Sequence, residues 1–170
     1  MEKNYDIIVA GGGHAGIEAA LAGARMGLSV ILITFSKDKI GYMSCNPAIG
    51  GVGKGQLVKE IDALGGEMAK ATDSTGIQFR ILNSSKGPAV WSSRAQVDRK
   101  RYAAYMQEVI SKEKNIEVIE GEVRGLIVEN NRVKGVEIDG ENVRGETVIL
   151  TPGTFLNGTI YIGMEKISGG

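Results

Sequence analysis

The sequence DIIVAGGGHAG occupies residues 6–16 and decides the fold. The apolar run at residues 6–10 is short and rich in β-branched residues, which is typical of a strand buried on both faces of a parallel sheet. The alanine-rich residues 14–26 predict a helix that ends at Gly27, and residues 29–34 predict a second buried strand. These elements form a β-α-β unit whose crossover is expected to be right-handed.

The three glycines with G-x-G-x-x-G spacing lie between the first strand and the helix, where a dinucleotide-binding turn belongs. Gly11 permits the tight turn, Gly13 lets a pyrophosphate approach the main chain, and Gly16 lets the helix pack closely on the strand. The N–H groups of the first helical turn then face the phosphates. The alternative is a glycine-rich turn with no ligand, but the flanking elements favour binding. The predicted phosphate-binding residues are Gly11, Gly12, Gly13, His14, Ala15 and Gly16, with His14 as a hydrogen-bonding residue rather than a base.

An acidic residue usually ends the second strand of such a fold and binds the ribose. Here that place holds Thr34, Phe35 and Ser36, and the nearest acid is Asp38. The ribose contact is therefore left open, with the hydroxyl of Thr34 or Ser36 as a weaker substitute.

The rest of the chain alternates helices and short strands before an all-strand final third. Residues 56–64 and 96–112 have the apolar spacing of helices, residues 77–82 predict a strand, and residues 83–93 predict a loop. Four further strands are predicted at 116–120, 123–129, 133–138 and 147–150, with hairpin turns at Asn130-Asn131 and Asp139-Gly140. The fold class is therefore α/β: a Rossmann-like parallel sheet with a small antiparallel β-meander.

Composition excludes several classes of protein. The 170 residues fit one domain, and glycine, with 25 residues, is about twice its usual ~7% share. Basic and acidic side chains balance at 20 each, so bulk charge indicates neither a nucleic-acid nor a membrane partner. One cysteine and one histidine exclude a disulfide framework and argue against a metal site. No apolar run approaches the ~20 residues of a membrane span, and we expect a reducing, cytoplasmic location.

A second glycine-rich loop covers residues 44–55. It resembles a P-loop, but the first glycine of that motif falls on Ala48 and its Ser/Thr on Gly55, so an NTPase is rejected. The loop leads into the predicted helix at 56–64, so it is either a second anion site or a flexible connection. Its Cys45 is either a small buried hydrophobe, as lone cysteines usually are, or a reactive thiol.

The segment 80–101 is strongly basic and has an aromatic residue at its centre. This pattern is typical of contact with phosphates or single-stranded nucleic acid, although a solvated, basic helix start would look the same. The residues concerned are Arg80, Lys86, Arg94, Arg99, Lys100 and Arg101, with Trp91 among them and Asp98 as the one acid.

Several segments together resemble one family, that of the glucose-inhibited division protein A (GidA, or MnmG). They are residues 11–20, 43–51, 62–66, 76–80 and 85–90, of which Ser-Cys-Asn-Pro and Lys-Gly-Pro-Ala-Val are far more specific than the glycine spacing. Members of this family are the FAD-binding subunit of the enzyme that installs carboxymethylaminomethyl groups on the wobble uridine of tRNA.

The resemblance implies a glutathione-reductase-like FAD-binding fold. The FAD pyrophosphate would lie on residues 11–16, Val123 would touch the adenine, and Gly153 would pass near the cofactor. The missing strand-end acid agrees with this family. Cys45 would be the catalytic thiol near the uridine, and the basic segment would bind tRNA or the carboxylates of folate through Lys86, Arg94, Arg99, Lys100 and Arg101.

The resemblance also implies cofactors and partners. Methylenetetrahydrofolate would donate the one-carbon unit, FAD would act as carrier, glycine or ammonium would supply the amine, and NADH would serve the full-length protein. The partners would be tRNA, a GTPase subunit and, at full length, a second copy of the chain.

Family members are several times longer than this chain, so we expect a fragment. We expect a single incomplete FAD-binding domain, with a β-α-β unit at 1–35, an inserted loop and helix region at 36–113, and a β-meander with return strand at 114–155. By itself the piece is not expected to catalyse the full reaction. Two alternatives stay open: a folate- and FAD-dependent tRNA uridine methyltransferase or other flavin oxidoreductase, and a non-catalytic nucleotide- or RNA-binding module.

Overall fold

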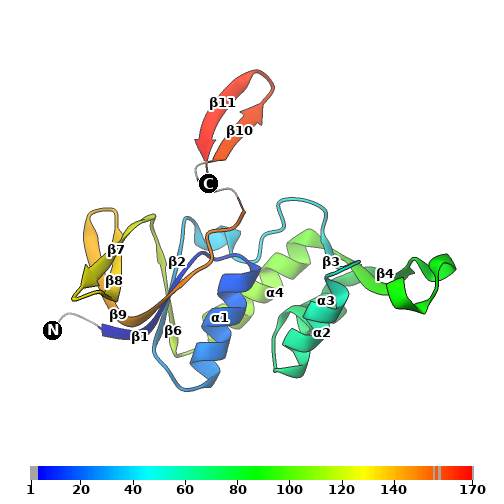
Figure 1. The fold of residues 1–170 in the computed structure, drawn as a ribbon, viewed down its shortest axis with the longest axis horizontal. Helices are drawn as coiled ribbons and strands as arrows, with labels where there is room; N and C mark the ends of the chain where they lie inside the picture. Colours follow the sequence, from blue (N-terminus) through cyan, green and yellow to red (C-terminus); the bar gives the residue numbers. More distant parts are fainter. Residues whose placement is uncertain (1–3, 155, 157, 170) are drawn as a thin grey trace. The chain divides into compact units, whose positions relative to one another are not determined.

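The computed structural model describes residues 4–154, 156 and 158–169. The chain divides into two compact units, the first made of Met1–Lys37 with Asn115–Gly170 and the second of Asp38–Lys114 (Figure 1). The first unit contains a six-stranded and a two-stranded sheet and the second a three-stranded sheet, and each unit is described separately below.

The main sheet of the first unit has the strand order β6-β2-β1-β9-β8-β7. The strands β6 (Ile116–Glu120), β2 (Val30–Thr34), β1 (Asn4–Ala10) and β9 (Glu141–Leu150) run parallel. β9, β8 (Arg132–Ile138) and β7 (Val123–Glu129) form an antiparallel meander. The α/β fold with a parallel sheet and a β-meander is therefore confirmed.

The long strand β9 joins the two parts of this sheet. Its end pairs in parallel with β1, as at Ile7 and Thr147, while its beginning pairs antiparallel with β8, as at Ile138 and Glu141. The strand predicted at 147–150 is thus the second half of a ten-residue strand. The first half of the strand was not predicted because its charged and polar residues interrupt the apolar pattern.

Both predicted hairpin turns are confirmed. Asn130 and Asn131 have φ angles of 49° and 59°, and Asp139 and Gly140 have φ angles of 47° and 90°. Two consecutive positive φ angles define the turn that matches the twist of a two-residue hairpin, and Asn, Asp and Gly tolerate them best.

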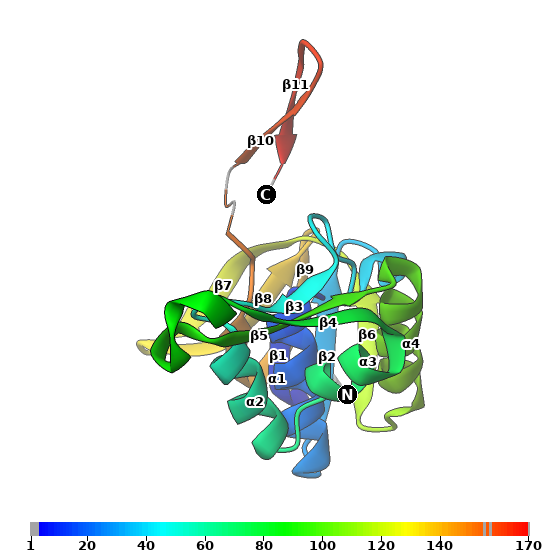
Figure 2. The ribbon, with the colours of Figure 1, turned by 90° about the vertical axis from the view of Figure 1, so that its right-hand side faces the viewer.

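The helix α1 (His14–Arg25) packs against β1 and β2, as Figure 2 shows. Gly23 lies so close to Ile7 and Val30 that a β-carbon there would touch both side chains. The chain leaves the helix through Gly27, whose φ is +81°, and the N–H of Leu28 bonds the Gly23 carbonyl at 3.2 Å. Gly27 therefore ends the helix as predicted, although α1 is one residue shorter than expected.

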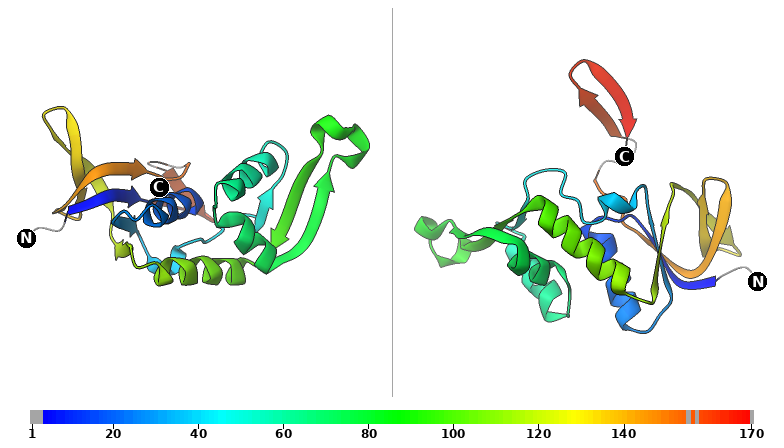
Figure 3. Two further views of the ribbon diagram at one scale, coloured as in Figure 1. Left: turned by 90° about the horizontal axis from the view of Figure 1, so that it is seen from below. Right: turned by 180° about the vertical axis from the view of Figure 1, so that it is seen from behind.

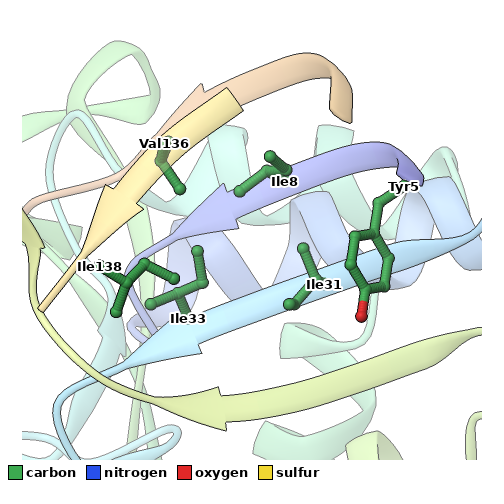
Figure 4. Close-up of a cluster of buried hydrophobic side chains, with 6 residues drawn as sticks. All are labelled: Tyr5, Ile8, Ile31, Ile33, Val136 and Ile138. Atoms are coloured by element: carbon green, nitrogen blue, oxygen red, sulfur yellow. The ribbon is translucent and has the colours of Figure 1, made fainter. Parts of the chain in front are cut away.

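A hydrophobic cluster joins β1, β2 and β8 (Figure 4). It consists of Tyr5, Ile8, Ile31, Ile33, Val136 and Ile138, all less than 9% exposed. Each buried aliphatic side chain of this kind stabilises the fold by about 1.5–3 kcal/mol. The Tyr5 hydroxyl donates to the Glu117 carboxylate at 2.8 Å, so its polar end is also satisfied.

The second unit has a small antiparallel sheet of order β3-β5-β4, made of Ala48–Gly50, Ser92–Val97 and Gly76–Leu82. Its helices are α2 (Gly55–Ala63), α3 (Met68–Thr75) and α4 (Arg99–Lys112). Figure 3 shows the β4–β5 hairpin, in green, extending beyond α2 and α3 to a tip made of two short 3-10 turns, Ser84–Lys86 and Pro88–Val90. None of the helices in the described part of either unit is long and apolar enough to cross a bilayer.

Two expectations for this unit are wrong in detail. The helix expected from Gln96 begins at Arg99, because Gln96 pairs with Gln78 in the sheet and Asp98 caps the helix. The Asp98 carboxylate accepts hydrogen bonds from the main-chain N–H groups of Lys100 and Arg101 at 2.9 and 3.0 Å. The predicted loop at 83–93 accordingly ends before Ser92, where β5 begins.

A last hairpin, β10 (Gly158–Ile162) with β11 (Glu165–Gly169), forms a separate two-stranded sheet. No sequence pattern indicated this hairpin.

Candidate functional site

The turn between β1 and α1 leaves the beginning of the helix open. Gly13 caps α1 with an extended backbone and provides no side-chain hydrogen bond to the helix. Its carbonyl accepts the N–H of Ile17 at 2.9 Å. The N–H groups of a first helical turn have no partner within their own helix, so an uncapped start such as this is suited to an anion.

Gly11 and Gly16 are required by the packing of the chain itself. Gly11 has φ +117°, and a β-carbon there would overlap the carbonyl oxygen of Thr151. A β-carbon on Gly16 would overlap the carbonyl oxygen of Gly11. The Thr151 hydroxyl closes the arrangement by donating to the Ala10 carbonyl at 2.9 Å, with the Gly11 carbonyl 3.2 Å away.

Gly13 is different, because the packing of the described residues does not require a glycine there. Its φ of −77° and ψ of −176° suit any residue, and apart from its chain neighbours no atom of the described residues lies within 4 Å of the place where its β-carbon would be. The space in front of Gly13 is therefore open. A phosphate group that packs against the bare main chain would account for a glycine at this position.

A cavity of about 360 Å³ lies beside this turn, at the carboxyl ends of β1 and β2. Such ends are where ligands bind in open α/β sheets. Of the predicted cofactor-binding residues, Gly11, Gly12 and Val123 line the cavity. Gly13, which caps α1, and His14, Ala15 and Gly16, which form its first turn, do not line it.

The late turn after β9 also reaches this cavity. Pro152 is one of its lining residues, and Gly153 follows with φ +82° and open space around its β-carbon position. The structure thus brings three separate predicted segments, at Gly11, Val123 and Gly153, to the same end of one sheet.

The cavity contains a carboxylate that the sequence analysis missed. Thr34 is buried and its hydroxyl donates to the Ser36 carbonyl at 3.4 Å, whereas Asp38 belongs to the other unit. Thr34 and Glu122 both line the cavity, and the Glu122 carboxylate lies 2.6 Å from the guanidinium of Arg124. Glu122 follows β6 rather than β2, so a search for an acid at the end of the second strand could not find it.

Burial favours the neutral form of the His14 imidazole. Burial lowers the pKa of His14 below its ordinary value, and the nearby Glu18 carboxylate offsets part of this shift. A neutral ring at the start of α1 fits the predicted role as a hydrogen-bonding residue better than that of a charged group.

Cys45 lies in the second unit as an exposed free thiol. The interpretation as a small buried hydrophobe is therefore wrong. A guanidinium nitrogen of Arg99 donates to the main-chain carbonyl of Cys45 at 2.5 Å, and the Ser44 hydroxyl lies 3.8 Å from the sulfur. The Arg99 guanidinium also lies 5.8 Å from the centre of the Tyr42 ring. These contacts hold the loop main chain and leave the thiol accessible.

The glycine-rich loop that follows Cys45 is attached to β5. The N–H of Gly51 bonds the Ser93 carbonyl at 2.8 Å, and the Ser92 hydroxyl donates to the Gly51 carbonyl. Gly55, which begins α2, would bring a β-carbon within 3.0 Å of the Ser93 carbonyl. The loop is therefore a packed part of this unit, and its helix begins without a side-chain cap.

The structure separates the basic segment into three places rather than one patch. Arg80 and Arg94 lie opposite each other on β4 and β5, and Lys86 lies at the tip of their hairpin. Arg99, Lys100 and Arg101 form the first turn of α4. Trp91 is half exposed, and its indole N–H donates to the Ser84 carbonyl at 3.2 Å.

Comparison with known proteins shows that the chain is similar to one family over nearly its whole length. A family model described as "Glucose inhibited division protein A" matches residues 6–170. A protein of Geobacter sulfurreducens named "tRNA uridine 5-carboxymethylaminomethyl modification enzyme MnmG" is 57% identical over 170 residues, which are 99% of this chain and 27% of that protein. The structure of Aquifex aeolicus GidA, in its form I crystal, matches with a TM-score of 0.92 at 55% identity, covering 99% of this chain and 28% of that one.

A more distant structure shows the fold alone. It is pqsL from Pseudomonas aeruginosa, described as a probable FAD-dependent monooxygenase, with a TM-score of 0.59 at 14% identity over 86% of this chain and 42% of that one. The chain spans about a quarter of the length of the two close relatives.

Proposed function

Because the chain belongs to the glucose inhibited division protein A family, as its sequence motifs indicated, we propose that it is the FAD-binding portion of a tRNA uridine 5-carboxymethylaminomethyl modification enzyme. The observation that carries this proposal is 57% identity to such an enzyme over 99% of the chain, together with an open dinucleotide-type turn. The two alternatives from the sequence, a uridine methyltransferase and a non-catalytic module, have no comparable support.

The residues at the end of the main sheet fit FAD. Its pyrophosphate would lie in the open space at Gly13, against the N–H groups that begin α1, and its adenine would lie near Val123. Gly153 would approach the cofactor from the turn after β9, and the Glu122 carboxylate would accept from the ribose hydroxyls in place of the missing strand-end acid. When bound, FAD supplies hydride and electron transfer, which no protein side chain provides.

The one-carbon donor in this proposal is methylenetetrahydrofolate, the amine comes from glycine or ammonium, and NADH supplies reducing equivalents to the full-length protein. Cys45 is the proposed catalytic thiol, because it is the exposed thiol in the loop that the family motif shares. The arginine contact to its main-chain carbonyl would hold the loop while the thiol meets the uridine.

The proposed partners are tRNA, a GTPase subunit and a second copy of the full-length chain, and the proposed location is the cytoplasm. We further propose that both units belong to one incomplete FAD-binding domain, in which residues 36–113 are inserted between the β-α-β unit and the meander. The unit boundaries at Lys37 and Lys114 support this division.

The test uses the full-length protein with its GTPase partner, an unmodified tRNA, FAD, NADH, methylenetetrahydrofolate and glycine. We expect mass spectrometry of the digested tRNA to show 5-carboxymethylaminomethyluridine. A 5-methyluridine product would support the methyltransferase instead. Tight tRNA binding with no new nucleoside would support the non-catalytic module, and either result would contradict the proposal.

A further inference from the structure

Two pairs of polar side chains face each other across β4 and β5. Arg80 pairs with Arg94, and two residues along the same strands Gln78 pairs with Gln96. Directly opposite residues of an antiparallel pair point to the same side, and every second residue along a strand does so too. The four side chains therefore share one face of the small sheet, which we call the Gln–Arg face.

On the other face of this sheet β5 packs against α2 and α3 of the same unit, while Phe79 and Ile81 of β4 are exposed. Ala95 and Val97 are buried there, and the Phe79 ring lies against Gly76, the residue that directly follows α3. On the Gln–Arg face, Gln78 and Arg80 are exposed and Arg94 and Gln96 are half-buried. The third strand adds only a methyl group at Ala48 and no side chain at Gly50 beside Gln96 and Arg94.

The arginine pair is electrostatically unfavourable as it stands. Directly opposite residues have their β-carbons about 5 Å apart, and like charges in this position destabilise a sheet. Arginine cannot relieve the repulsion by losing its proton. Within the described residues, neither guanidinium forms an ion pair or a hydrogen bond. An anion between the two guanidinium groups would turn this repulsion into attraction.

The chemistry of the face selects the kind of anion. A guanidinium group is a planar fork that bonds two oxygens of one phosphate, and two adjacent forks fit a phosphate better than they fit a lone halide. Each glutamine amide carries both donors and acceptors, which match the polar edge of a nucleobase. The glutamine pair lies roughly 7 Å from the arginine pair along the strands, so one nucleotide spans both pairs.

We propose that the Gln–Arg face binds a nucleotide of a single-stranded RNA segment, with its phosphate on Arg80 and Arg94 and its base edge on Gln78 and Gln96. Open sheet faces serve single-stranded RNA in this way, because unpaired bases expose their hydrogen-bonding edges. The proposal rests on the proposed function, in which RNA is the substrate. It assigns tRNA contact to the sheet rather than to the beginning of α4, where Arg99 already bonds the Cys45 loop.

The first experiment measures tRNA affinity against salt concentration for the full-length, FAD-loaded protein and its Arg80→Gln variant. We expect the variant to bind about tenfold more weakly, and the slope of log affinity against log salt to become shallower by about 0.7. The matched control is Arg132→Gln, which removes an exposed arginine of β8 in the other unit and should leave both values unchanged. If Arg80→Gln behaves like Arg132→Gln while the parent protein binds tRNA, the RNA site is refuted and the proposed function stands.

The second experiment tests the glutamine pair apart from the arginine pair, and it distinguishes an RNA phosphate from a folate carboxylate as the bound anion. Replacing both Gln78 and Gln96 by alanine should keep the salt slope but abolish the preference for a uridine strand over a strand of equal length that lacks bases. Gln56→Ala, on the exposed side of α2, is the control and should keep this preference. A loss of methylenetetrahydrofolate binding with unchanged tRNA binding in Arg80→Gln would assign the arginines to folate carboxylates and overturn the proposal.

The free energy of unfolding distinguishes a binding role of Arg80 from a structural one. Removing one of two opposed positive charges should leave the free energy of unfolding of Arg80→Gln equal to or above that of the parent. If that variant does not fold, Arg80→Lys replaces it, because lysine keeps the charge and loses the fork. We expect Arg80→Lys to retain the salt slope and weaken tRNA binding, whereas unchanged binding would refute the two-pronged contact. A parent protein that binds no tRNA would remove this proposal together with the proposed function.

Discussion

The carbonyl oxygen of Gly11 occupies the space that a β-carbon on Gly16 would need. This contact sets how closely α1 approaches the end of β1, and it is made by main-chain atoms that cannot rotate away. The same approach leaves the space at Gly13 open. Three glycines of one motif therefore have two different roles, and substitutions separate them.

Gly16→Ala is expected to lower the free energy of unfolding by about 1–3 kcal/mol, because the added methyl group overpacks a rigid contact. Urea denaturation followed by circular dichroism measures the change. The control is Gly13→Ala, which has room for its methyl group and should stay within about 0.5 kcal/mol of the parent. Equal midpoints for Gly16→Ala and Gly13→Ala would show that the close contact is absent.

His14 should make stability depend on pH near neutrality. Its pKa is lowered in the folded protein, so the unfolded chain binds a proton more readily. The stabilising contribution of the neutral ring is therefore complete above the unfolded pKa of about 6.5 and is lost as pH falls through the folded value. Because the 170-residue chain has one histidine, its free energy of unfolding should fall between about pH 7.5 and pH 5.5.

The matched variant for this prediction is His14→Gln, which keeps a polar side chain without a titration in this range. Its stability should be flat over the same pH interval. A parent and a variant with parallel pH curves would mean that burial does not depress the pKa of His14.

Cys45→Ser should separate folding from catalysis. The thiol is exposed, and the Arg99 contact involves the main-chain carbonyl. We therefore expect the free energy of unfolding to stay within about 0.5 kcal/mol of the parent's and the flavin absorbance to be unchanged. In the full-length protein, nucleoside mass spectrometry should show that tRNA modification is lost. Ser44→Ala, next to it in the same loop, should retain modification. Normal modification by Cys45→Ser would remove the thiol from the proposed chemistry.

The part of the fold that local sequence determines was predictable. The β-branched run before Gly11, the positive-φ residues at Asn130-Asn131 and Asp139-Gly140, and the stop at Gly27 each encode one local conformation. The strand Ser92–Val97 was not predictable in the same way, because its only buried apolar side chains are Ala95 and Val97 on one face, and the face with Ser92, Arg94 and Gln96 is polar. The cap at Asp98 is the signal that could have placed the start of α4 correctly.

In the candidate site, too, the features that local sequence determines were predictable and those that depend on tertiary structure were not. The turn at Gly11 was found because its function and its spacing are both local. Glu122 was missed because it follows β6 rather than β2. Arg80 and Arg94 were both assigned to the basic segment, but their pairing was missed because it depends on the register of the sheet. Arg80 and Arg94 are separated by a hairpin, and only the register shows that they face each other.

The central claim is that a flavin pyrophosphate lies on the open turn at Gly13. The direct measurement is the visible absorbance of full-length Gly13→Val after incubation with FAD and removal of free FAD by gel filtration, beside the parent protein. The free energy of unfolding of Gly13→Val should stay within about 1 kcal/mol of the parent's, because the side chain enters open space at a helix cap. The variant should nevertheless carry no flavin. A Gly13→Val protein with the full flavin spectrum of the parent would contradict the claim.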